Sequence, residues 1–218
     1  MAQPFLVIIA GPNGSGKTTL THRLRDTGFD LGEYINADDI AAGLAGAPGD
    51  VSREAQRLAE EARQSCLANG VSFSFETVMS HASKIDLLNQ AKTLGYYVLL
   101  FFVGVDDPRI NIDRVAQRVS LGGHDVPIDR IVRRYERTMS LLPAAIRAAD
   151  RSVLFDNSHS DHGGGASLVP IVEVIRDPDG ELELAVLSGE GAPELLPNWA
   201  ARPLLKAVPF HWEWKRSQ

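Results

Sequence analysis

A segment near the start of the chain has the residue types that cradle phosphate groups. It consists of Gly11, Pro12, Asn13, Gly14, Ser15, Gly16, Lys17 and Thr18, and it matches the pattern G-x-x-x-x-G-K-[ST]. Its glycines let backbone N–H groups point at phosphate oxygens, its lysine reaches the β- and γ-phosphates, and its threonine hydroxyl is placed to bind Mg²⁺. An apolar run at 5–10 precedes the segment and a helical pattern at 17–25 follows it. We therefore expect a strand, a phosphate loop and a helix that bind ATP with Mg²⁺, and we add Thr19 to the predicted contacts.

Acidic residues follow two of the expected strands. Asp38 and Asp39 come after a short strand at 34–36, and Glu76 ends a strand at 71–75. Parallel sheets bind ligands at the carboxyl ends of their strands, and phosphoryl transfer needs one carboxylate at the attacking hydroxyl and another near the metal. We assign the hydroxyl to Asp38 and the metal to Asp39 with Thr18. Substrate contacts are assigned to Asp38, Glu76, Thr77, Ser80 and His124. Which aspartate faces the site stays open, because aspartate is also a good helix N-cap.

Arginines gather on two consecutive helical patterns in the second half of the chain. Arg114 and Arg118 are one turn apart on the first, and the second carries four arginines on its polar side, at 130, 133, 134 and 137. The glycine-containing segment 122–127 lies between the two patterns, which is typical of a lid that closes over the phosphates. We assign Arg118 to the phosphates and to catalysis, and Arg134 to the substrate. The alternative is that these arginines are simply solvated on a polar helix face.

Apolar runs alternate with helical patterns along most of the sequence. Strands are expected at 5–10, 34–36, 71–75, 96–105 and 153–155, and helices at 17–25, 52–68, 83–94, 108–121 and 128–146. This alternation predicts an α/β fold of the P-loop NTPase type, a three-layer α/β/α structure with a mainly parallel five-stranded sheet. We expect residues 1–160 to form this kinase-like domain. Residues 161–218 would form an extension packed on it, with a loop, a β-hairpin (168–175 and 182–187) and a tail with a helix near 199–207.

The composition excludes several classes of protein. Hydrophobic residues make up 44% and charged residues 23% of the chain, which is typical of a globular domain. A net charge of -6 argues against a general nucleic-acid binder. The single cysteine, Cys66, excludes a disulfide within the chain, and no apolar stretch approaches the length of a membrane span. We therefore expect a cytoplasmic protein that does not enter a membrane.

Some suggestive residues receive a structural or weaker assignment. Cys66 lies on the apolar face of its helix and should pack in the core, and His81 should lie at the surface. Asn157 follows the last expected parallel strand, near where adenine binds in P-loop kinases. His159, Asp161 and His162 lie in a polar, glycine-rich loop, which we interpret as a solvated loop and not as a metal site. The tryptophans expected to anchor the tail to the core are Trp199, Trp212 and Trp214.

The chain resembles the zeta-toxin family of P-loop kinases from about residue 5 to about residue 158. The resemblance rests on GPNGSGKTT (11–19), INADDIA (35–41), FETVMS (75–80) and the stretch RVAQRVSLGGHDVP…RRYER (114–137). It implies that Asp38 activates the acceptor hydroxyl, that Glu76 contacts substrate and that Arg118 clamps the phosphates. It also implies UDP-N-acetylglucosamine as acceptor and an antitoxin protein as partner. The chain departs from the family at His124, which stands near where a second arginine is placed, at Val78, which replaces a threonine, and in its hairpin.

Three functions are compatible with these residues. The first is a kinase that transfers the γ-phosphoryl group of ATP to a hydroxyl of a small molecule, such as a sugar nucleotide. The second is an ATP-hydrolysing switch related to ABC ATPases, since 120–124 (SLGGH) is similar to their signature loop. In those proteins, however, the signature precedes the acid-ending strand, and here it follows the strand at 98–107. The third is a nucleic-acid end kinase, which the acidic net charge and the lack of an aromatic platform disfavour.

Overall fold

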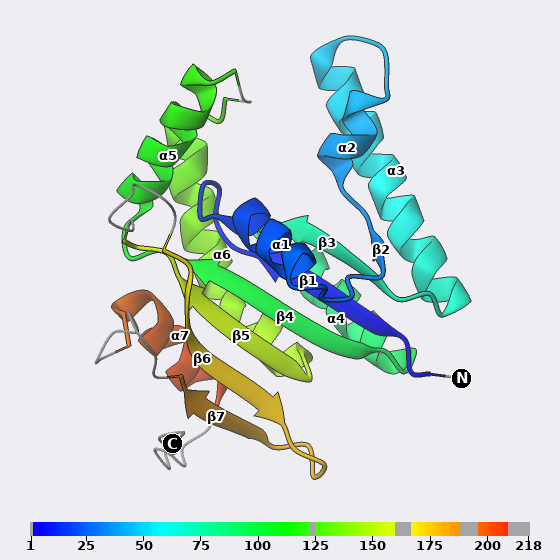
Figure 1. Ribbon diagram of the computed structural model, residues 1–218, viewed down its shortest axis with the longest axis vertical. Coiled ribbons are helices and arrows are strands. Elements are labelled where there is room, and N and C mark those ends of the chain that lie inside the picture. The colour runs from blue at the N-terminus through cyan, green and yellow to red at the C-terminus, as the bar shows by residue number, and fades with distance from the viewer. Residues whose placement is uncertain (1, 123–124, 160–166, 188–195, 209–218) are drawn as a thin grey trace.

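The computed structural model describes residues 2–122, 125–159, 167–187 and 196–208. Its centre is a seven-stranded sheet with the order β2-β3-β1-β4-β5-β6-β7 (Figure 1). The strands are β1 (Phe5–Ala10), β2 (Glu33–Tyr34), β3 (Phe73–Thr77), β4 (Tyr97–Gly104), β5 (Arg151–Asp156), β6 (Val169–Arg176) and β7 (Leu182–Val186). The first five pair in parallel, whereas β6 and β7 pair antiparallel to their neighbours.

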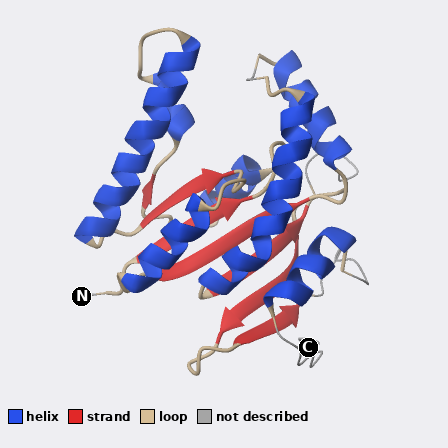
Figure 2. Cartoon of the chain, turned by 180° about the vertical axis from the view of Figure 1, so that it is seen from behind, coloured by secondary structure: helices blue, strands red, loops and turns tan. Residues whose placement is uncertain are grey.

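Helices cover both faces of this sheet. They are α1 (Lys17–Asp26), α2 (Ala37–Ala42), α3 (Pro48–Asn69), α4 (Ser83–Thr93), α5 (Pro108–Ser120), α6 (Ile128–Ala148) and α7 (Asn198–Ala207). Helix α1 lies on one face, and α4, α6 and α7 lie on the other, as the two opposite views show (Figures 1 and 2). The expected three-layer α/β/α class is therefore confirmed. None of the described helices is both long and apolar enough to cross a membrane.

Strand β1 contributes side chains to two apolar clusters, one on each face of the sheet. Its side chains alternate, so that Leu6 and Ile8 pack in the larger cluster with α4, α6 and α7, while Val7 and Ile9 pack in the smaller cluster with α1. All four side chains are at most 1% exposed. A continuous apolar run is what a central strand covered on both faces requires. The phosphate-binding segment therefore begins at the end of the most buried strand in the sheet.

The expected five-stranded sheet is wrong in one respect, because the hairpin belongs to the same sheet. Strand β6 pairs along β5, with Ile175 opposite Arg151 and Val174 opposite Ser152. Val172 and Val174 complete the larger apolar cluster, so pairing at this edge buries apolar surface that β5 would otherwise expose. The antiparallel partner of a strand depends on contacts distant in the sequence, which local patterns do not record.

The tail anchor is present in the described part of the tail. Trp199 on α7 is 6% exposed, and its indole Nε1 donates a hydrogen bond to Asp156 Oδ1 at 2.8 Å. Its ring packs on Phe102, with ring centroids 5.8 Å apart. The expected anchoring role is thus confirmed for Trp199, whereas Trp212 and Trp214 lie outside the described residues.

Several elements differ in extent from the sequence-based expectation. Helix α2 was not expected, α3 begins four residues earlier than the pattern at 52–68, and β3 ends at Thr77, beyond Glu76. Helix α4 begins at Ser83, and its N-cap residue, Ala82, provides no side-chain hydrogen bond. Its first N–H group, that of Ser83, donates instead to Nδ1 of His81 at 3.2 Å. These differences all lie near the carboxyl ends of the parallel strands, where tertiary contacts decide the local conformation.

Candidate active site

The loop between β1 and α1 has the conformation of a phosphate cradle. Gly11, Gly14 and Gly16 have positive φ angles of 151°, 72° and 102°. A Cβ atom at Gly11 would lie 2.3 Å from the carbonyl oxygen of Val103, and one at Gly16 would lie 2.5 Å from Asn157 Nδ2. Only glycine fits such positions. The loop leads directly into α1, whose first residue is Lys17. Its backbone therefore turns inward at the positive end of a helix, the arrangement that binds phosphate.

Two buried asparagines donate hydrogen bonds to backbone carbonyl groups of this loop. Asn111 on α5 donates to the carbonyl oxygen of Asn13 at 2.5 Å, and Asn157 after β5 donates to that of Ser15 at 2.7 Å. Their residues are 0% and 1% exposed, respectively. Asn157 was assigned to adenine from the sequence, and that assignment stays a prediction. The role of Asn111 was missed, although an asparagine among the apolar positions of the α5 pattern is a recognisable signal.

Lys17 lies within the loop and is largely desolvated. Its Nζ donates to the carbonyl oxygens of Gly11 at 2.9 Å and Pro12 at 2.8 Å. Burial lowers the pKa of Lys17 to about 8, and the opposing charge of Glu76 offsets only part of this effect. Arg118 also lowers the pKa of Lys17 through its charge. A buried ammonium group with this environment is well suited to bind the charged end of a polyphosphate.

Glu76 is fixed by three hydroxyl groups. Its Oε2 accepts a hydrogen bond from Thr18 at 2.9 Å, and its Oε1 accepts bonds from Thr21 at 2.7 Å and from Tyr34 at 3.0 Å. Strand β3 lies beside β1, with Glu76 opposite Ile9, which brings the carboxylate to the first turn of α1. Burial and then the charge of Glu76 raise the pKa of the Tyr34 hydroxyl. Thr21 and Tyr34 were missed, although Thr21 shares a helix face with Thr18.

The two adjacent aspartates differ in what they face. Asn36 caps α2 by accepting the N–H of Asp38 at 2.9 Å, so both aspartates lie in the first turn of a helix. Asp38 lines a cavity next to the phosphate loop, whereas Asp39 is not part of its lining. The charge of Asp39 instead acts on the hydroxyl of Tyr34.

This cavity joins most of the predicted site residues. It has a volume of about 510 Å³, and side chains from α2 and α3, from α5 and α6 and from the phosphate loop line it. The predicted site residues in its wall are Asn13, Gly14, Lys17, Thr18, Asp38, Glu76, Thr77, Ser80, Arg118 and Arg134. Thr19 is exposed on α1 outside the wall, and His124 lies outside the described residues. The cavity therefore joins part of the phosphate loop with two carboxylates and the two predicted arginines, Arg118 and Arg134.

The arginines approach the loop from the opposite side to α2. Arg134 Nη1 donates to Asn13 Oδ1 at 3.5 Å, and burial, followed by the charge of Arg130, lowers the pKa of Arg134. Arg118 is near enough to Lys17 to act on its pKa. Two guanidinium groups facing a phosphate loop can neutralise negative charge that builds up between them.

Sequence reasoning missed part of the cavity wall. Gln56 and Arg63 from α3 and Lys84 from α4 all line it, and Val78, which replaces a threonine of the family, lines it as well. His81, expected at the surface, is exposed and also lines the cavity. The only signal for these residues is a charged or polar position on a long amphipathic helix, and such positions are usually solvated.

Two other residues set aside from the sequence, Cys66 and His159, are not part of the cavity wall. Cys66 is 4% exposed, and burial raises the pKa of its thiol to about 11, in keeping with a packing role. The described part of the chain contains no group of three His, Cys, Asp or Glu side chains that could hold a metal ion. Asp161 and His162 lie outside the described residues.

Comparison with solved structures shows a shared fold. A chain of the AvrRxo1-ORF1:AvrRxo1-ORF2 complex matches with a TM-score of 0.62 and 20% identity, covering 89% of this chain and 66% of that chain. The same complex with ATP matches with a TM-score of 0.62 and 22% identity, over 89% of this chain and 65% of the other. The chain thus spans slightly less than two thirds of those proteins. The PezAT toxin–antitoxin system of Streptococcus pneumoniae matches with a TM-score of 0.53 and 15% identity, over 76% and 70%.

Sequence comparison identifies the family. An uncharacterized protein of Haemophilus influenzae is 31% identical over 130 residues, which is 59% of this chain and 91% of that protein. The zeta toxin family matches residues 1–160, a stretch that contains the phosphate loop and both carboxylates and all three arginines that line the cavity. The chain therefore belongs to the zeta toxin family.

Proposed function

We propose that the protein is an ATP-dependent kinase that transfers the γ-phosphoryl group of ATP to a hydroxyl of a small molecule. The observation that carries this proposal is that Lys17, Asp38 and Glu76 line one cavity with Arg118 and Arg134. Phosphoryl transfer is catalysed mainly by positioning and by electrostatic stabilisation, and these five side chains supply both. Membership of the zeta toxin family supports the same class of enzyme.

The phosphates of ATP would bind in the glycine loop. Backbone N–H groups of the loop and the Lys17 ammonium group would hold the β- and γ-phosphates, and Arg118 would approach the γ-phosphate from α5. The structure of the AvrRxo1-ORF1:-ORF2 complex with ATP, which has the same fold, supports ATP as the nucleotide. Asn111 and Asn157 keep the loop in shape from below and do not line the cavity.

The residues near the start of α1 fit a magnesium ion. The Thr18 hydroxyl and the Glu76 carboxylate are 2.9 Å apart, and Mg²⁺ prefers such hard oxygen ligands. We propose that Thr18 and Glu76 hold the ion, and we move the metal role from Asp39, which does not line the cavity, to Glu76. Bound Mg²⁺ would neutralise charge on the phosphate oxygens.

Asp38 would act on the acceptor. The acceptor hydroxyl oxygen attacks the γ-phosphorus, the bond from that phosphorus to the bridging oxygen breaks, and ADP leaves with the bonding electrons. The hydroxyl proton passes to the Asp38 carboxylate, while Lys17 and Arg118 stabilise the charge on the transferring group. Asp38 reaches the cavity from the α2 side, opposite the arginines of α5 and α6, which suits a base that faces the acceptor.

For the acceptor, we propose a sugar nucleotide such as UDP-N-acetylglucosamine. The resemblance of the sequence motifs to the zeta-toxin family implies this acceptor, and the cavity, at about 510 Å³, is large enough to hold more than the end of a triphosphate. A protein partner that blocks the site is proposed as well, because PezAT is a toxin–antitoxin system and AvrRxo1-ORF1 is seen in complex with ORF2.

A transfer screen tests the proposal. The protein is incubated with γ-labelled Mg·ATP and a panel of sugar nucleotides, nucleosides, metabolites and oligonucleotide ends, with Lys17→Ala as the control. Label on UDP-N-acetylglucosamine that depends on Lys17 supports the full proposal, and label on another small molecule replaces the acceptor. Free phosphate with no labelled acceptor favours an ATP-hydrolysing switch, and label on oligonucleotides favours a nucleic-acid end kinase.

A further inference from the structure

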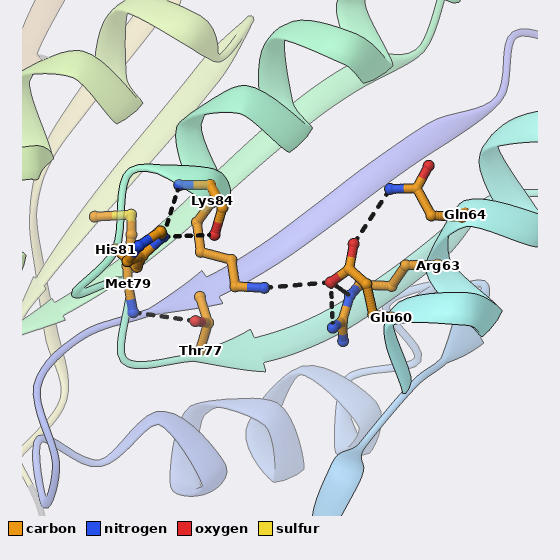
Figure 3. A network of polar contacts seen from close by, with 8 residues as sticks. Glu60, Arg63, Gln64, Thr77, Met79, His81 and Lys84 are labelled. Atoms are coloured by element: carbon orange, nitrogen blue, oxygen red, sulfur yellow. Dashed lines mark hydrogen bonds and ion pairs between the residues drawn. The ribbon is translucent and has the colours of Figure 1, made fainter. Parts of the chain in front are cut away.

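The end of the cavity formed by α3 and α4 contains two cations that share one carboxylate. Oε2 of Glu60 accepts a hydrogen bond from Arg63 Nη2 at 2.7 Å, and it lies 3.5 Å from Lys84 Nζ (Figure 3). The other oxygen, Oε1, accepts a hydrogen bond from Gln64 at 3.2 Å. Arg63 and Lys84 line the cavity, whereas Glu60 does not. This end of the cavity therefore carries a surplus positive charge.

The two cations are unusually well shielded from water for side chains of their kind. The side chains of Arg63 and Lys84 are 6% and 22% exposed, while that of Glu60 is 44% exposed. Both lie against the ring of Phe75, with the Arg63 Cζ 4.9 Å and the Lys84 Nζ 5.9 Å from its centroid. Burial, and then the Arg63 charge, lower the pKa of Lys84, and Glu60 offsets only part of that effect. One partly exposed carboxylate thus pairs with two shielded cations, and the net positive charge that remains can attract a further anion.

The loop that leads to Lys84 is held in one conformation. Met79 has a φ angle of 55°, a backbone conformation that residues other than glycine rarely adopt. Its N–H donates to Thr77 Oγ1 at 3.0 Å, and the preceding carbonyl, that of Val78, accepts a bond from Thr138 on α6 at 2.7 Å. Strained loops of this sort persist where the surroundings determine them, and they gather at binding sites. Here the loop places Ser80, His81 and the start of α4 in the cavity wall.

We propose that Arg63 and Lys84 bind an acidic group of the acceptor, a phosphate or a carboxylate, and so select anionic acceptors over neutral ones. The inference rests on the proposed kinase function and specifies it further. The acidic group would lie at the α3–α4 end of the cavity, and the hydroxyl to be phosphorylated would lie at Asp38. Glu60 is the resident counter-ion, which the acidic group of the acceptor displaces from Lys84.

Binding of small anions tests this inference apart from catalysis. The phosphate loop is first filled with the non-hydrolysable analogue adenylyl imidodiphosphate and equimolar Mg²⁺. Pyrophosphate and malonate, a phosphate and a carboxylate probe, are then titrated calorimetrically. At least one of them should bind to the wild-type protein, and the better probe shows which acidic group the site prefers. Lys84→Gln and Arg63→Gln should each weaken its binding at least about fivefold, because each removes a charge-assisted hydrogen bond.

Matched variants complete the experiment. Arg57→Gln removes an arginine of the same helix that pairs with Glu54 and Glu61 outside the cavity, and it should leave anion binding unchanged. Glu60→Gln should tighten binding, because the competing carboxylate is lost, and Lys84→Arg should restore most of the wild-type affinity. The inference is overturned if neither probe binds, or if Lys84→Gln binds as tightly as Arg57→Gln. Should Arg63→Gln fail to fold, the partly exposed Lys84 still decides the result.

The outcome also separates this inference from the proposed kinase function. If the probes bind as expected but no acceptor is ever labelled, the kinase proposal fails and the anion site stands. If instead a neutral acceptor is phosphorylated equally well by the wild-type protein and by Lys84→Gln, the kinase proposal stands and the anion site is refuted as a specificity element.

Discussion

Asp38 and Asp39 are neighbours in the sequence, yet only Asp38 lines the cavity that contains Lys17. We predict that Asp38→Asn lowers kcat by at least about 100-fold, because the amide cannot accept the hydroxyl proton. The affinity for Mg·ATP should stay close to that of the wild-type protein. Steady-state kinetics and calorimetric ATP titration measure the two effects. Asp39→Asn is the matched control, and equal losses of kcat in both variants would contradict the assignment of Asp38.

Lys17 gives ATP binding a pH dependence. Its pKa is about 8 in the protein alone, and the phosphates of ATP favour the charged form, so that ATP binding raises this pKa. Below about pH 8 the ammonium group is already charged, and above it binding requires the uptake of a proton. The affinity for ATP should therefore fall by up to about tenfold per pH unit above this value.

Titration calorimetry at about pH 7.5 and about pH 9.5 measures this change, since ATP itself does not change its charge in that interval. Lys17→Arg is the control, because arginine stays protonated over the whole range. A wild-type affinity that is flat with pH, or an equally steep decline in Lys17→Arg, would exclude Lys17 as the titrating group.

At the scale of single elements, the phosphate loop is supported by Asn157 at the end of β5 and by Asn111 on α5, both distant from it in the sequence. Asn157→Ala would leave the carbonyl of Ser15 without its donor and should lower the free energy of unfolding by about 1–3 kcal/mol. It should also weaken ATP binding, since the loop loses its support. Chemical denaturation and ATP titration measure the two effects. Asn69→Ala, an exposed asparagine at the end of α3, is the control and should change neither.

Element boundaries could be predicted from the sequence only where local signals dominate. The loop and α1 were found because their motif is contiguous, and Glu76 because it ends an apolar run. Helix α2 was missed, since its six residues are stabilised by the Asn36 cap and by packing on α3. Arg63 and Lys84 were missed for a related reason: they belong to different helices, and only the folded chain brings them together at Glu60.

At the scale of the whole molecule, the hairpin extends the sheet that carries the site, and α7 packs on one face of that sheet. Trp199→Ala would remove a buried ring and its bond to Asp156, and it should lower the free energy of unfolding by about 3–5 kcal/mol. Leu205→Ala on the same helix is the control, because Leu205 is 48% exposed and should cost far less. Denaturation curves for the two variants test this. A small effect of Trp199→Ala would mean that α7 contributes little to the stability of the core.

The overall class was predictable because apolar runs and helical patterns alternate along the chain. The presence of seven strands in one sheet was not predictable, because the pairing of β6 with β5 depends on apolar contacts that form only in the folded chain. The resemblance to a family ended near residue 158, just before that hairpin, so it offered no guide to these strands.

The bond between Trp199 and Asp156 has a consequence for the newly made chain. Asp156 is next to Asn157, whose side chain donates a hydrogen bond to the phosphate loop. Helix α7, through Trp199, therefore helps to hold in place the residue that supports a loop near the N-terminus. Protein synthesis runs from the N-terminus, and the phosphate loop therefore emerges from the ribosome long before the helix that secures it. Nascent chains should gain full affinity for ATP only after α7 has emerged from the ribosome, so ATP binding would lag behind the synthesis of the loop that performs it.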